Sequence, residues 1–96
     1  MKYFNDIPGM IEPIEQEMLQ TIMSNINLDK NDFLVEYGAF FGKSTKCILE
    51  GLKNNKSYAS TNNLIIYDSF KCNVIGGFSK YVYSFAKQGN VENLIL

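Results

Sequence analysis

Residues 34–45, Leu-Val-Glu-Tyr-Gly-Ala-Phe-Phe-Gly-Lys-Ser-Thr, constrain the fold more strongly than any other part of the chain. An apolar strand runs into the carboxylate of Glu36, and Gly38 and Gly42 then precede the hydroxyl side chains of a helix start. Glycine lets the backbone approach a ligand closely, and the N-terminus of a helix directs its N–H groups toward the same point. This order predicts a ligand-binding turn at the carboxyl end of a strand.

The last four residues of this stretch, Gly-Lys-Ser-Thr at 42–45, also match the end of a phosphate-binding P-loop. A P-loop needs four residues before its second glycine, whereas three separate Gly38 from Gly42, and Tyr37 stands where the first glycine is required. Glu36 would repel a phosphate, and none of the nine cationic side chains is an arginine. We therefore favour a ligand without phosphates and keep a P-loop-like nucleotide binder as an alternative.

A second acidic residue, Asp68, ends the apolar run at 63–67. In α/β folds that bind nucleosides, an acid at the end of the second strand holds the ribose hydroxyls, about 20 residues after the glycine turn. Asp68 follows Gly42 at a comparable separation. This spacing favours ribose binding over a solvated turn residue or a Walker-B-like acid.

The spacing of Glu36, Gly38, Gly42 and Ser44 resembles the first motif of class I S-adenosylmethionine-dependent methyltransferases. The likeness is strongest to small-molecule O-methyltransferases of the catechol and macrolide-sugar type. The triplet Asp-Ser-Phe at 68–70 is similar to one at the same place in the macrolide-sugar enzymes. The resemblance implies S-adenosylmethionine as the cofactor, with Glu36 on its ammonium side and Asp68 on its ribose.

Residues 10–27 are expected to form a helix, because apolar residues at 11, 14, 18, 19, 22, 23 and 26 recur on one side. Small-molecule O-methyltransferases carry a similar helix, whose leading residues line the cofactor pocket; the alternative is a helix whose apolar stripe only packs in the core. The position of Phe40 is often aromatic in these enzymes, with core packing again as the alternative. The cofactor-binding residues implied by the resemblance are Met10, Ile11, Glu36, Gly38, Ala39, Phe40, Gly42, Ser44, Asp68 and Ser69.

The whole pattern predicts an α/β, Rossmann-like methyltransferase half-fold. An N-terminal helix is followed over residues 33–96 by elements in the order β-α-β-α-β, whose strands form a parallel sheet. Strands are expected at 33–37, 63–68 and 94–96, and helices at 44–53 and 78–88. Residues 1–96 would form a single, partial cofactor-binding domain, because complete class I methyltransferase domains are roughly twice as long. The missing half would carry the adenine contacts, the catalytic base and any Mg²⁺ ligands, so no catalytic residue is assigned.

The first strand of this family lies between two others, so residues 33–37 of a half-fold would form an exposed apolar edge. Such an edge is a template for self-association or for docking of a missing C-terminal half. An alternative function is therefore that of a truncated, non-catalytic remnant that serves as an assembly or interaction module.

The amino-acid composition excludes several classes of binding partner. A net charge of −1 without a basic patch excludes nucleic acid, and the chain has neither a membrane-spanning apolar run nor a signal peptide, which predicts a cytoplasmic protein. There is no histidine, and Cys47 and Cys72 lack metal-ligand spacing, so no metal site is expected within the chain. The function that the resemblance to small-molecule O-methyltransferases implies is methyl transfer to a hydroxyl of a small-molecule substrate such as a sugar, with the protein positioning the reactants.

Overall fold

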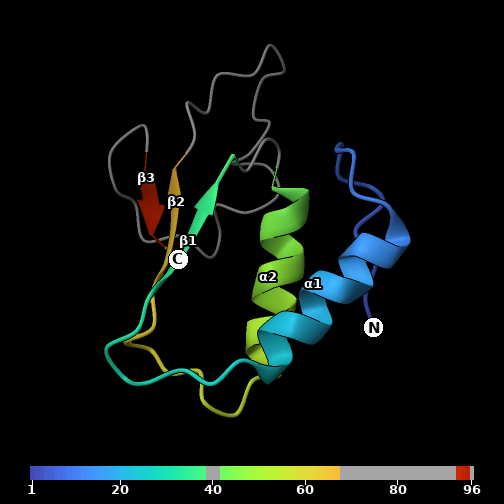
Figure 1. The fold of residues 1–96 in the computed structure, drawn as a ribbon. Helices are drawn as coiled ribbons and strands as arrows, with labels where there is room; N and C mark the ends of the chain where they lie inside the picture. Colours follow the sequence, from blue (N-terminus) through green and yellow to red (C-terminus); the bar gives the residue numbers. More distant parts are fainter. Residues whose placement is uncertain (39–41, 68–92, 96) are drawn as a thin grey trace.

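The computed structural model describes residues 1–38, 42–67 and 93–95, which form a small α/β domain. Its elements are α1 (Pro13–Asn25), β1 (Leu34–Tyr37), α2 (Lys43–Lys53), β2 (Leu64–Tyr67) and β3 (Asn93–Ile95). In Figure 1, α2 lies between the sheet and α1. Neither of these described helices has the length and hydrophobicity that a membrane span requires. The helix expected at 78–88 lies outside the described residues.

β1 and β2 pair in parallel, with Glu36 opposite Ile66 and Tyr37 opposite Tyr67. α2 connects the two strands, which confirms the predicted β-α-β unit, since parallel neighbours need a crossover connection. Burial alternates along both strands: Glu36 and Ile66 are buried, whereas Tyr37 and Tyr67 are exposed. The buried face is the one toward α2, because Glu36 is hydrogen-bonded to the first turn of that helix.

The third strand corrects the prediction of a wholly parallel sheet. β3 pairs with β2 in antiparallel orientation, with Ile65 opposite Ile95 and Tyr67 opposite Asn93. A short apolar run predicts a strand but carries no information on its direction, and an antiparallel neighbour needs only a reversal of the chain. The order of the described strands is β1-β2-β3, so β1 forms one edge of this sheet.

α1 is shorter than the predicted 10–27. It begins at Pro13, whose fixed φ suits the first helical position, and Ile26 already has an extended backbone. Glu12 and Glu15 form a capping box, in which the Glu15 carboxylate accepts a hydrogen bond from the Glu12 N–H at 2.9 Å. Residues 10 and 11 therefore precede the helix and belong to the N-terminal segment, defined here as residues 1–11.

The buried face of α1 is polar, although its apolar residues form a helical stripe. Gln16 and Gln20 are buried, whereas Ile14, Met18 and Ile22 are 63%, 57% and 48% exposed. The two glutamines bind the backbone of the N-terminal segment, so this face serves for amide hydrogen bonds. The predicted apolar stripe therefore packs only in part: Leu19 and Met23 are half-buried, and the fully buried positions of α1 are the two glutamines. Hydrophobic periodicity does not report where polar groups find partners.

α1 and α2 lie close together at Gly51, which is buried. A Cβ atom at this position would lie 2.5 Å from the Met23 Cβ and 2.7 Å from the Gln20 carbonyl oxygen. Atoms in a packed interior do not approach so closely, so the missing side chain is what allows the two helices to cross here.

Two buried asparagines hold the connecting loops. The Asn55 amide donates to the carbonyl oxygens of Met23 and Ile26 at the end of α1, at 2.7 and 2.8 Å. The Asn62 amide donates to two carbonyl oxygens of the loop before β1, both at 2.8 Å. These bonds satisfy backbone acceptors and tie the connection after α2 to the connection after α1.

We predict that Gly51→Ala destabilises the protein, although alanine is the better helix former by about 1 kcal/mol. The added methyl group must displace α1, and overpacking of this kind costs roughly 1–3 kcal/mol. Urea unfolding followed by circular dichroism measures the change. Lys53→Ala, at an exposed position of the same helix, is the control and should change stability by less than about 0.5 kcal/mol. Unchanged or increased stability of Gly51→Ala would contradict the close crossing.

Candidate functional site

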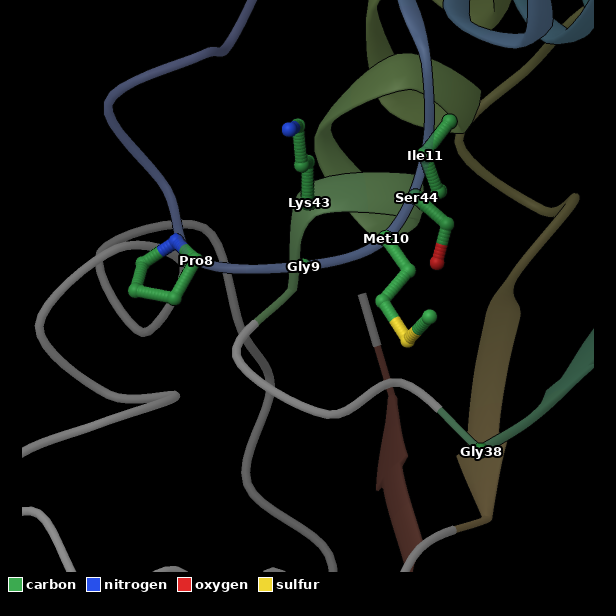
Figure 2. Close-up of a pocket in the computed structure, with 7 residues that line it drawn as sticks. All are labelled: Pro8, Gly9, Met10, Ile11, Gly38, Lys43 and Ser44. Carbon is green, nitrogen blue, oxygen red and sulfur yellow. The ribbon is translucent and has the colours of Figure 1, made fainter.

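A cavity of about 360 Å³ opens where β1 ends and α2 begins (Figure 2). The N-terminal segment forms one wall, and the end of β1 with the start of α2 forms the other. Its size is within the range of small-ligand sites, and the carboxyl end of a parallel strand is where α/β folds bind ligands. The lining residues are Pro8, Gly9, Met10, Ile11, Gly38, Lys43 and Ser44.

Four of the residues predicted from the sequence line this cavity together: Met10, Ile11, Gly38 and Ser44. Figure 2 shows the Met10 side chain pointing into the space between the start of α2 and Gly38. Met10 is 96% exposed, so its thioether is available for contact with a ligand. The alternative that Met10 packs in the core is therefore not supported.

Gly38 and Gly42 both have a left-handed backbone, with φ of +78° and +97°. Other residues rarely adopt this conformation, so the path from β1 into α2 requires glycine at both positions. A Cβ atom at Gly38 would meet nothing within 4 Å, which leaves open space at the cavity wall. Gly42 is the N-cap of α2 and is buried outside the cavity lining.

The Glu36 carboxylate joins the end of β1 to the first turn of α2. It is 8% exposed and accepts hydrogen bonds from Ser44 Oγ and Thr45 Oγ1, each at 2.5 Å. Charge-assisted bonds and the positive end of the helix dipole both stabilise a carboxylate at this position. Glu36 does not line the cavity, so its direct contact with a ligand ammonium stays a prediction.

Ser44 connects this buried carboxylate to the cavity, because its side chain lines the cavity and donates its hydrogen to Glu36. An ionised carboxylate can only accept hydrogen bonds, so the hydroxyl hydrogen of Ser44 is used in the bond to Glu36. The lone pairs on the Ser44 oxygen are then left for a ligand. In this state the hydroxyl suits a hydrogen-bond donor, such as an ammonium or a sugar hydroxyl, and offers no hydrogen to a phosphate oxygen.

Two glutamines of α1 hold the N-terminal segment in place. The Gln16 side chain accepts from the Phe4 N–H at 2.8 Å and donates to the Ile11 carbonyl oxygen at 3.4 Å. The Gln20 side chain accepts from the Lys2 N–H at 3.2 Å and donates to the Lys2 carbonyl oxygen at 2.6 Å. Both glutamines are buried, where such bonds are strengthened by the low dielectric. One wall of the cavity therefore depends on side chains that do not line it.

Pro8, Gly9 and Lys43 line the cavity but were not predicted as site residues. Lys43 is 8% exposed and packs against Gly9, where a Cβ atom would lie 3.3 Å from the Lys43 Cδ. Figure 2 shows the Lys43 amine pointing away from Met10. The neighbouring Ser44 could have indicated Lys43, whereas Pro-Gly at 8–9 signals only a turn.

Cys47 lies on α2 behind the cavity wall and is fully buried. Its Sγ donates a weak hydrogen bond to Gln16 Oε1 at 3.9 Å. Burial raises the pKa of the Cys47 thiol, so the thiol is protonated near neutral pH and is a poor nucleophile. Within residues 1–38, 42–67 and 93–95 there is also no cluster of acidic or cysteine side chains that could hold a metal ion.

Four predicted site residues lie outside the described residues: Ala39, Phe40, Asp68 and Ser69. The structure therefore brings together the part of the predicted site that comes from the N-terminal segment, the end of β1 and the start of α2. The ribose-binding part stays a prediction.

No family model matches the chain, and searches of curated proteins and of solved structures give no significant match. The resemblance to S-adenosylmethionine-dependent methyltransferases thus rests on the sequence motif alone.

We predict that Gln16→Leu loosens the N-terminal segment. The leucine cannot bind the Phe4 N–H, and an unsatisfied buried backbone group costs about 1–3 kcal/mol. Hydrogen exchange measured by NMR should show the Phe4 amide exchanging at least tenfold faster. Met18→Leu, on the exposed face of α1, is the matched control and should leave this exchange unchanged. Equal protection of Phe4 in Gln16→Leu and the wild type would show that other contacts fix the segment.

Proposed function

We propose that this chain is the S-adenosylmethionine-binding portion of a methyltransferase and that the cofactor lies in the cavity beside the β1–α2 turn. The observation that carries the proposal is the state of Ser44, which lines the cavity as a hydrogen-bond acceptor because its proton is held by Glu36. S-adenosylmethionine offers an ammonium and ribose hydroxyls as donors and has no phosphate. Its chemistry therefore matches the cavity better than that of a nucleoside triphosphate.

The lining supports the same ligand. Met10 and Ile11 provide an apolar surface, as expected for a site that encloses an organic cofactor. Gly38 has no side chain on its side of the cavity, so the ligand can approach the backbone at the end of β1. The parallel β1-α2-β2 unit beneath the cavity supports a Rossmann-like half-fold, whereas the antiparallel β3 departs from that pattern.

The proposed reaction transfers a methyl group to a hydroxyl oxygen of a small molecule such as a sugar. The bound cofactor supplies this methyl group on a sulfonium. The chain's own contribution is to position the ligand. Ser44, oriented by Glu36, receives the ammonium end, Asp68 binds the ribose hydroxyls, and Met10 covers the ligand from the N-terminal segment.

The P-loop alternative is disfavoured by the place of Glu36. In a P-loop, an anionic phosphate lies at the start of the helix that follows the glycines. Here a carboxylate of the chain itself is bound by Ser44 and Thr45 of the first turn of α2. A phosphate at the same place would meet a negative charge and hydroxyls whose protons are already donated.

We predict that isothermal titration calorimetry detects saturable binding of S-adenosylhomocysteine and no binding of ATP with Mg²⁺. Ser44→Ala removes the acceptor and should weaken binding roughly 5- to 10-fold, the value of one hydrogen bond. Asp68→Ala should weaken binding more than Lys43→Ala, whose amine points away from Met10.

The matched control is Ser24→Ala, which removes a serine hydroxyl at the far end of α1 and should leave affinity unchanged. Binding of ATP with Mg²⁺ that is lost in Lys43→Ala would favour the P-loop alternative. Heat signals from neither ligand, in a protein shown to be folded by circular dichroism, would contradict the proposed function.

A further inference from the structure

Another cavity, of about 500 Å³, lies at the carboxyl end of α2, whereas the cavity described above lies at its start. It is lined by residues 24–27, where α1 ends, and by residues 54–57, which follow α2. We name it the asparagine cavity, because four of these eight residues are asparagines. Figure 1 shows the carboxyl ends of both helices at this end of the domain, and the Asn55 amide joins them by its bond to the Met23 carbonyl oxygen.

Two of the lining residues are fully hydrogen-bonded within the protein. The buried Asn55 amide donates both of its hydrogens to carbonyl oxygens at the end of α1. Its oxygen accepts from the Ser57 N–H and hydroxyl, at 2.8 and 2.7 Å. The Ser57 oxygen accepts in turn from the Leu28 N–H at 3.0 Å. These bonds fix the shape of the asparagine cavity and leave ligand recognition to its other polar residues.

The other asparagines and Lys56 present groups that the protein does not use. The Asn25 and Asn54 amides each donate to the carbonyl oxygen four residues earlier, at 2.7 and 3.0 Å, which leaves their Oδ1 atoms as acceptors. Within the described chain, the side chains of Asn27 and Lys56 have no hydrogen bond or ion pair. All four side chains are exposed. The asparagine cavity therefore offers amide acceptors, amide donors and one ammonium to a ligand.

The charges around the asparagine cavity favour an uncharged ligand. α1 and α2 both end here, and the carboxyl end of a helix carries about half a negative charge, which disfavours an anion. The Lys56 ammonium disfavours a cation, and the lining residues 24–27 and 54–57 include no carboxylate that could bind one. Hydroxyl groups both donate and accept, so they match amide oxygens, amide hydrogens and an ammonium alike.

We propose that the asparagine cavity binds a neutral carbohydrate of one or two sugar rings. A volume of about 500 Å³ is within the range of small-ligand sites. Ile26 and the methylene stem of Lys56 add apolar surface for the carbon-bound hydrogens of a ring. The eleven residues of α2, about 16 Å at 1.5 Å each, separate this site from the β1–α2 turn. A sugar here is too far away to accept a methyl group there, so the inference does not rest on the proposed function.

The stretches outside the described structure, 39–41 and 68–92, join the domain at its other end. They are bordered by Gly38, Gly42, Tyr67 and Asn93. Gly38 and Gly42 flank the β1–α2 turn, and Tyr67 pairs with both Tyr37 and Asn93 at the same end of the sheet. The residues that line the asparagine cavity come instead from the carboxyl ends of the two helices.

NMR titration of the full chain with maltose, up to about 50 mM, tests the proposal over a range that detects millimolar affinity. We expect saturable shifts of the backbone amides of residues 24–27 and 54–57. Glucose 6-phosphate, which is anionic, and glucosamine in mildly acidic buffer, which is cationic, should bind more weakly than neutral glucose.

The double variant Asn27→Ala with Lys56→Met should weaken maltose binding roughly tenfold or more, because the hydrogen bonds of two side chains are lost. The matched control is Lys30→Met with Asn31→Ala, which changes the same residue types at exposed positions of the loop before β1. It should bind maltose like the wild type. Circular dichroism establishes that both double variants are folded.

Four outcomes would overturn the proposal. Maltose could leave residues 24–27 and 54–57 unshifted, or it could bind the folded Asn27→Ala, Lys56→Met variant as tightly as the wild type. Tighter binding of either charged sugar than of glucose would identify an ion site. Shifts confined to Met10, Gly38 and Ser44 would place the sugar in the cavity beside the β1–α2 turn.

Discussion

The described structure depends on one buried carboxylate. Glu36 stands at the end of β1 and accepts the hydroxyl hydrogens of Ser44 and Thr45 at the start of α2. An ionised group with 8% exposure is tolerated only where partners compensate for its lost hydration. The two hydroxyls and the helix dipole contribute to this compensation, and the two bonds join the end of β1 to the first turn of α2. Gly38 and Gly42 supply the left-handed backbone that the same path requires.

The layers of the fold follow from this junction. α2 lies over one face of the β1–β2 pair, and α1 packs against α2 where Gly51 leaves room for it (Figure 1). α1 in turn holds the N-terminal segment through Gln16 and Gln20. The cavity thus depends on successive contacts: β1 contacts α2, α2 contacts α1, and α1 holds the N-terminal segment beside the end of β1. Polar side chains make two of these connections, at Glu36 and at the two glutamines.

The sequence predicted those features that depend on local chemistry. The glycine turn, the parallel unit around α2 and the place of Met10 and Ile11 beside that turn agree with the structure, because backbone conformation and helix starts leave residue-specific signals. The direction of β3 could not be predicted, because an apolar tripeptide pairs either way. The burial of Gln16 and Gln20 could not be predicted from the sequence either, since their hydrogen-bond partners are backbone groups of a segment distant in the chain. Glu36 was recognised as important, but a motif cannot show that its oxygens are occupied by neighbouring hydroxyls.

The attachment of the N-terminal segment has a consequence for how a ligand reaches the cavity. The segment is fastened by two amide side chains, by the buried Ile7 and by the Lys46 amine over the Phe4 ring, at 5.6 Å from its centroid. Contacts of Tyr3 with Glu17, of Asn5 with Gln16 and of Lys2 with Glu50 add to these. A peripheral segment held mainly by side-chain contacts can open locally while the rest of the domain stays folded. Because Met10 and Ile11 belong to this segment, its local opening would remove one wall of the cavity while α1 and α2 stay packed.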